Sequence, residues 1–132
     1  MNKSNNMQTR EIPRADWRSF FDVFSRQHEG WLATLEVFGL EIGTQPATGE
    51  FPLKGIALTS VVGESEGITI NLGKAPEDHV KHTVIEPTHV WLVQTPEGAD
   101  AALEIVSADD KKTLLRFRSP VLPELVDGVV LE

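Results

Sequence analysis

The chain has 132 residues with a net charge of -8, from twenty acidic and twelve basic residues, and it contains no cysteine. This length fits a single domain with its own hydrophobic core. The acidic balance repels phosphate backbones and anionic lipid, so we expect neither nucleic acid nor a membrane as a partner. The lack of cysteine excludes disulfides and thiolate nucleophiles and suggests a reducing compartment, so we expect a cytoplasmic protein.

The two ends of the chain are expected to lie outside the folded core. Residues 1–9 are rich in Asn, Ser and Gln and offer little to bury, which predicts a mobile tail. Residues 10–128 are predicted to form one globular domain, followed by a C-terminal tail at 129–132. The N-terminus is polar and unlike a secretory signal, and no apolar run reaches the ~18 residues that a membrane span needs.

One amphipathic helix is predicted near the N-terminus. Pro13 suits its first turn, and Gly30 suits the left-handed residue that ends a helix. The helix carries an apolar stripe at helical spacing, which we expect to face the core with Trp17 and the following Trp31 nearest its rim; the stripe consists of Trp17, Phe20, Phe21, Phe24 and His28.

After Gly30 the apolar pattern changes to the two-residue period of β-strands. Residues 31–38 predict a strand, and residues 39–52 are rich in Gly and Pro and predict a long loop. Residues 53–62 and 67–72 flank a glycine turn, and the register that gathers their apolar side chains pairs Leu58 with Leu72.

The second half predicts a short strand at 79–85, a corner at Glu86-Pro87, and an antiparallel meander from residue 88 to 119. Residues 96–100 match a type I turn, and a second turn lies near 109–111. Apolar matching and charge matching together select one register, which pairs Trp91 with Ile105, Leu103 with Phe117 and Glu104 with Arg116.

These elements predict an α+β fold. The N-terminal helix would pack on a bent, mainly antiparallel sheet, or on a small barrel, of six to seven strands.

Several short motifs resemble a family of small bacterial proteins known only as a domain of unknown function. The resemblance spans about Gln8 to Gly128 and implies a stand-alone bacterial domain without an assigned activity. The motifs that carry it are Ile12-Pro13-Arg14, Trp17, Phe20, Phe24-Ser25-Arg26-Gln27-His28, Gly30-Trp31, His82-Thr83, Pro87 and Leu115-Arg116-Phe117-Arg118-Ser119-Pro120.

No motif indicates catalysis or a metal site. Asp22, Ser25 and His28 drift around the helix by 60° per step, and nothing nearby supplies an oxyanion hole. His79 and His82 are three residues apart, so on a strand they point to opposite faces and cannot share a metal. We therefore expect no catalytic residue, no bound zinc and no cofactor.

The candidate binding residues fall into three groups. A pocket between helix and sheet would be lined by Trp17, His28 and Trp31, and His82 at the strand corner is a separate candidate. Arg116 belongs to a basic stripe with Lys112 and Arg118, which would suit an anionic partner unless acidic neighbours neutralise it.

The sequence leaves two function classes open. The favoured one is a non-enzymatic module that binds a protein partner or a second copy of itself through an open sheet edge. The alternative is a small-molecule-binding protein, or less plausibly an enzyme, with a pocket between helix and sheet. A closed core with a free edge would favour the first class, and a sizeable cavity with convergent polar groups would favour the second.

Overall fold

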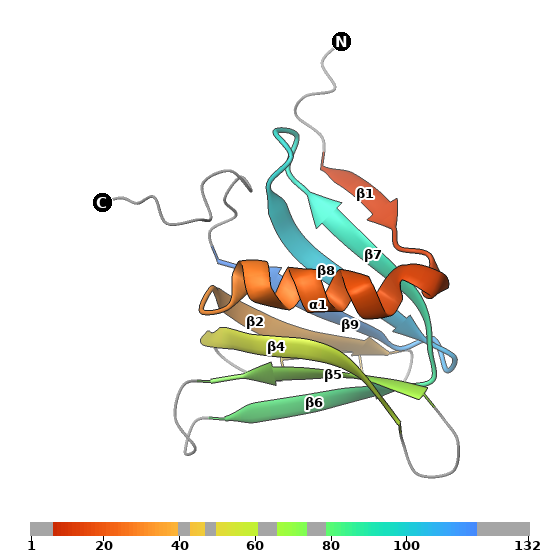
Figure 1. Ribbon diagram of the computed structural model, residues 1–132. Coiled ribbons are helices and arrows are strands. Elements are labelled where there is room, and N and C mark those ends of the chain that lie inside the picture. The colour runs from red at the N-terminus through yellow and green to blue at the C-terminus, as the bar shows by residue number, and fades with distance from the viewer. Residues whose placement is uncertain (1–6, 40–42, 47–49, 61–65, 74–78, 119–132) are drawn as a thin grey trace.

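The computed structural model describes residues 7–39, 43–46, 50–60, 66–73 and 79–118, which form one α-helix, a short 3-10 helix and nine strands (Figure 1). In chain order these elements are β1 (Gln8–Glu11), η2 (Arg14–Asp16), α1 (Trp17–His28), β2 (Leu32–Gly39), β3 (Gly43–Pro46), β4 (Phe51–Ser60), β5 (Glu66–Leu72), β6 (Val80–Ile85), β7 (Pro87–Gln94), β8 (Asp100–Ser107) and β9 (Lys112–Phe117).

All strand pairs are antiparallel, and the sheet runs in the order β1-β7-β8-β9-β2-β4-β5-β6, with β3 attached to β2. The predicted α+β class and antiparallel sheet are confirmed. The predicted count of six to seven strands is too low, because β1 begins inside the expected N-terminal tail and β3 lies inside the expected loop at 39–52. Within the described ranges no pairing joins β1 to β6, so the sheet is open.

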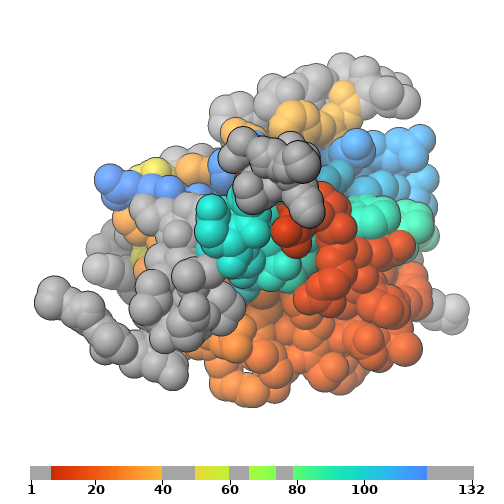
Figure 2. Space-filling view, turned by 90° about the horizontal axis from the view of Figure 1, so that it is seen from above, coloured from red at the N-terminus to blue at the C-terminus, as the bar shows by residue number. Residues whose placement is uncertain are grey.

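The sheet bends around α1, which lies across its concave side (Figure 1). Strands β7 and β8 rise above the helix in this view, and β4, β5 and β6 lie below it. Seen from above, the atoms of β1 and α1 (red to orange) form a continuous surface beside β7 (cyan) (Figure 2). The helix therefore covers much of the opening between the two halves of the bent sheet.

The predicted helix and its stop are confirmed. The helix ends at His28, and Gly30 has a φ of +90°, a conformation that glycine adopts without a steric cost. The aromatic stripe lies against the sheet, with Trp17, Phe21, Phe24 and His28 buried and Phe20 partly buried. Trp17 is 1% exposed, so it does not reach the rim as expected, whereas Trp31 is only half-buried.

The predicted register between β7 and β8 is wrong by one residue. The structure pairs Trp91 with Glu104 and Val90 with Ile105. The predicted turn forms, with the N–H of Gly98 donating to the carbonyl of Thr95. Irregularities lie at Val93/Gln94 and at Pro87/His89, and one extra residue in a strand reverses the face of every side chain beyond it. Between the two irregularities, the buried side chains of β7 are consequently Val90 and Leu92.

Two further registers differ by an even number of residues and keep their buried faces. Leu103 pairs with Leu115 instead of Phe117, and Glu104 pairs with Leu114 instead of Arg116, because the turn after β8 is tighter than expected. Leu58 pairs with Ile68 instead of Leu72. An even shift leaves the same side chains facing the core, which explains why the burial pattern was predicted correctly where the partners were not.

In the part of the chain that the structure describes, no helix is both long and apolar enough to cross a bilayer. The predicted C-terminal tail at 129–132 and most of the predicted N-terminal tail lie outside the described residues.

Candidate functional site

The five candidate residues from the sequence do not converge on one site. His28 and Trp31 lie together, with ring centroids 4.4 Å apart. Trp17 begins the helix, where its indole N–H donates to the carbonyl of Ile12. His82 lies on β6, and Arg116 is exposed on β9. The predicted pocket lined by Trp17, His28 and Trp31 is therefore not formed as a single site.

His28 is the centre of a buried polar network. Its Nδ1 atom lies 2.7 Å from the carbonyl oxygen of Phe24, and its Nε2 atom lies 3.0 Å from a carboxylate oxygen of Asp100. The amide nitrogen of Gln94 donates to the other carboxylate oxygen at 2.9 Å. His28 and Asp100 are both buried, so this network ties the last turn of α1 to the beginning of β8.

The network sets the charge state of Asp100. Burial raises the pKa of Asp100, but the hydrogen bonds from His28 and Gln94 and the positive charges of His28 and Arg10 outweigh it and lower that pKa. The carboxylate is thus ionised at neutral pH. The two nitrogens of the His28 ring thus face two acceptors, the Phe24 carbonyl and the Asp100 carboxylate.

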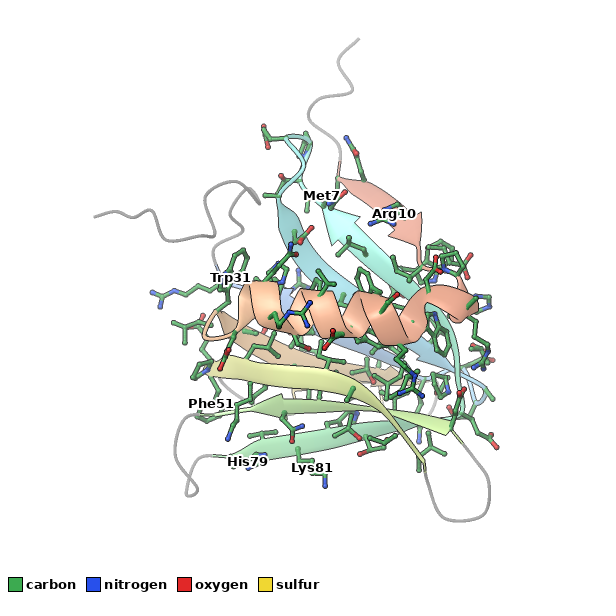
Figure 3. The ribbon with its side chains drawn as sticks, viewed as in Figure 1. Met7, Arg10, Trp31, Phe51, His79 and Lys81 are labelled. Carbon is green, nitrogen blue, oxygen red and sulfur yellow. The ribbon has the colours of Figure 1, made fainter. Side chains whose placement is uncertain are left out.

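Aromatic rings enclose the His28 side of this pair. The ring of His28 stacks on Phe117 with centroids 5.1 Å apart, and Trp31 meets it edge-on. The ring of Phe24 packs against it with centroids 4.1 Å apart and the planes tilted by 32°. Figure 3 shows Trp31 at this end of the helix with Phe51 below it. With its ring 1% exposed and both nitrogens engaged, His28 has no free nitrogen for a substrate. The arrangement anchors the helix and does not resemble a catalytic site.

A groove lies between α1 and the outer edge of β4. The strand β4 bonds to β5 through Gly55, Ala57 and Thr59, so the N–H and C=O groups of Leu53, Ile56 and Leu58 point away from β5. The carbonyl of Glu66 accepts from the N–H of Glu86, so the backbone groups of Glu66 and of every second residue after it on β5 point toward β6. The residues between them, which pair with Gly55, Ala57 and Thr59, therefore bond to β4.

The outward backbone groups of Leu53 and Ile56 on β4 have hydrogen-bond partners, whereas those of Leu58 do not within the described ranges. Leu53 exchanges backbone hydrogen bonds with Gly30 and Trp31. Ile56 bonds at both its N–H and its C=O to the hydroxyl of Ser25, at 2.8 and 3.1 Å. Leu58 has no such backbone or side-chain partner within the described ranges, and beside it a groove of about 630 Å³ opens. The described residues that line it are Ala15, Arg18, Ser19, Phe21, Asp22, Ile56, Ala57 and Leu58.

A second hollow, of about 360 Å³, lies where β6 approaches the turn between β8 and β9. His82 contributes to its wall, and burial lowers the pKa of this ring, so it is neutral at neutral pH. The sequence did not associate His82 with this turn, because the contact depends on the corner at Glu86, which has a φ of +56°.

The predicted basic stripe is neutralised by acidic neighbours. Its members Lys112, Arg116 and Arg118 lie 3.6–3.8 Å from the carboxylates of Glu104, Glu36 and Glu50, respectively. Such exposed pairs contribute little to stability, but they cancel the charge that an anionic partner would require.

The histidines outside α1 point to separate places. His79 bonds to Asn71, and His89 bonds to Glu11 on the exposed face. No group of three His, Asp or Glu residues that could hold a metal ion occurs in the described part of the chain.

Comparisons with known proteins give a family but no activity. A family model described as "Family of unknown function (DUF5335)" matches residues 8–125. An uncharacterised protein of Aquifex aeolicus (strain VF5) is 26% identical over 127 residues, which cover 89% of this chain and 100% of that protein. No solved structure matches the chain.

Proposed function

We propose from the geometry alone that this protein is a peptide-binding module. It belongs to the family of unknown function described above, which has no activity assigned to it. An extended segment of a partner protein would add to the outer edge of β4, beside α1. In this mode of recognition, backbone hydrogen bonds provide affinity and the side-chain pockets provide specificity.

The proposal rests on one observation, which is that the series of hydrogen-bond partners along the outer edge of β4 stops before Leu58. Main chain covers Leu53, and the Ser25 hydroxyl covers Ile56, but the outward N–H and C=O of Leu58 face the groove. A backbone donor and acceptor at a sheet edge form a template for another strand. The neighbouring helix supplies a wall against which the side chains of that strand would pack.

The groove also indicates the chemistry of its occupant. Phe21, Ile56 and Leu58 supply apolar surface, while the carboxylate of Asp22 is held by Arg26 at 2.6 Å. Arg18 lines the groove and forms no ion pair with the residues that the structure describes. We therefore expect the bound segment to place an apolar side chain over Leu58 and a carboxylate near Arg18.

The edge at β1 is less suited to the same role. This strand has four residues, all exposed, and includes the charged side chains of Arg10 and Glu11. Short, charged edge strands discourage the addition of another strand.

A displayed library of random linear peptides tests the proposal. We expect selection of acidic and apolar sequences whose binding, measured by fluorescence anisotropy, is lost in Ser19→Trp, because the indole fills the groove from an exposed helix position. Gln27→Trp is the matched control, since Gln27 is also exposed on α1 but does not line the groove.

Arg18→Glu should weaken the selected peptides by about tenfold, the effect of roughly 1.4 kcal/mol, if their carboxylate meets the guanidinium. Failure to select any peptide would contradict the proposal. Equal binding to the wild type and to Ser19→Trp would also contradict it, because the peptides would then occupy another surface.

A further inference from the structure

The hollow beside β6 has a polar interior wall. By strand parity, His82 and Val84 point to the same side as the buried Ile68 and Ile70 with which they pair. Thr113 likewise shares the buried face of β9 with Leu115. These side chains meet Val37 of β2 and Ser107 of β8 around a volume of about 360 Å³, which falls within the usual range of small-molecule sites.

Two polar side chains in this wall lack partners among the described residues. Thr113 is 3% exposed, and no hydrogen bond joins its hydroxyl to the described part of the chain. A buried hydroxyl without a partner costs free energy, so it indicates a position where something else supplies the bond. The ring of His82 is half-buried and likewise makes no hydrogen bond with a described residue.

The donors and acceptors suit an uncharged ligand. Burial lowers the pKa of His82, so its neutral ring offers one donor and one acceptor, and the Thr113 hydroxyl offers the same pair. At the mouth, Lys111 lies 3.4 Å from Asp109, and the additional carboxylate of Glu86 leaves a net negative charge that disfavours anions.

The walls define the rest of the ligand. Val37, Val84 and Ile85 contribute apolar surface, and Ile85 remains 53% exposed. We propose that this hollow binds a small uncharged molecule with an apolar body and one hydroxyl or amide group, which bonds to Thr113 and His82. Its lining shares no described residue with the groove beside β4, so this site is independent of the proposed peptide site.

The test uses hexanamide and hexanol as uncharged probes and hexanoate as the anionic control. In the full-length protein we expect NMR shifts of the Val37, Val84 and Ile85 methyl groups on titration with an uncharged probe. Hexanoate should bind about tenfold more weakly, because Glu86 and Asp109 oppose its charge.

Three variants connect binding to the hydroxyl. Thr113→Val keeps the shape and should weaken the better probe by about tenfold, whereas Thr113→Ser keeps the hydroxyl and should retain binding. Thr34→Val, on the opposite face of the neighbouring strand β2, controls for the general effect of replacing a threonine.

Two results would overturn this proposal. The first is that neither uncharged probe shifts the three methyl groups up to its solubility limit, which would mean that the hollow holds only water. The second is that Thr113→Val and Thr34→Val bind the probe equally, which would mean that the hydroxyl has no role in binding.

Discussion

The buried pair of His28 and Asp100 gives the sharpest stability prediction. Their side chains are 2% and 11% exposed. Asp100→Ala removes the acceptor and leaves the buried Nε2 atom of His28 and the amide of Gln94 without their partner. Loss of one partner of a buried hydrogen bond costs about 1–3 kcal/mol, so the free energy of unfolding should fall by that amount in a urea melt followed by circular dichroism.

The exposed pair between Asp22 and Arg26 supplies the matched control. Its side chains are 66% and 65% exposed, and Asp22→Ala should cost no more than about 0.5 kcal/mol. The double variant His28→Phe with Asp100→Leu should lose less stability than Asp100→Ala, because it removes both members of the pair and leaves neither one buried alone.

The pH dependence of the same pair follows from the sign of the shift. Folding lowers the pKa of Asp100 from 3.8, so its contribution to stability is fully present above pH 3.8 and disappears as the pH falls through the lower folded value. The difference between the wild type and Asp100→Asn should therefore shrink in strongly acidic solution. Equal losses in Asp100→Ala and Asp22→Ala, or a difference that grows with acidity, would refute this account of the network.

Four further predictions concern other parts of the molecule. Ile105→Ala should cost about 2–5 kcal/mol in a urea melt, because Ile105 is fully buried, whereas Glu104→Ala should cost at most about 1 kcal/mol; similar midpoint shifts would contradict the assigned faces. Ser25→Ala should cost about 1–3 kcal/mol, because the N–H and C=O of Ile56 both lose their partner, and an unchanged midpoint would contradict that role. Folding lowers the pKa of His82, so its protonation favours the unfolded state below pH 6.5; His82→Gln should flatten the stability profile between that pH and the lower folded value, and a parallel profile would contradict it. Removal of metal by a chelator should leave the melting temperature unchanged, and stoichiometric zinc in elemental analysis together with a lower melting temperature after chelation would contradict that expectation.

Local patterns predicted the helix and the buried faces of most strands. The aromatic stripe and Gly30 specify α1 through side-chain periodicity and backbone conformation, both of which are local properties. The alternation of Ala33 and Leu35 likewise identifies the buried face of β2, where both residues are fully buried.

The strand partners were harder to predict because they depend on bulges and turn lengths. The irregularity at Val93/Gln94 reverses which side chains of β7 face the core. The sequence around it alternates without a visible break, and that alternation favours Trp91 on the buried face. Charge matching between Glu104 and Arg116 gave false support, because each side chain reaches a different partner, Lys112 and Glu36 respectively.

The sites depend on contacts between residues far apart in the chain. Asp100 was predicted only as part of a turn, and nothing local indicates that it meets His28. Ser25 fell on the helix side facing β4, where its hydroxyl bonds to the backbone of a strand 31 residues later. Such pairs follow from the docking of α1 on the sheet, which no single stretch of sequence specifies.

Backbone hydrogen exchange at Leu58 tests the proposed peptide site most directly. The Leu58 N–H points away from β5 toward the groove, so we expect rapid exchange in the free protein and protection when a selected peptide is bound. The amide of Ala57, which faces β5, should be protected in both states and serves as the internal reference. A peptide that binds without slowing exchange at Leu58, or that instead protects the edge of β1 or β6, would contradict the assignment of the β4 edge as the binding site.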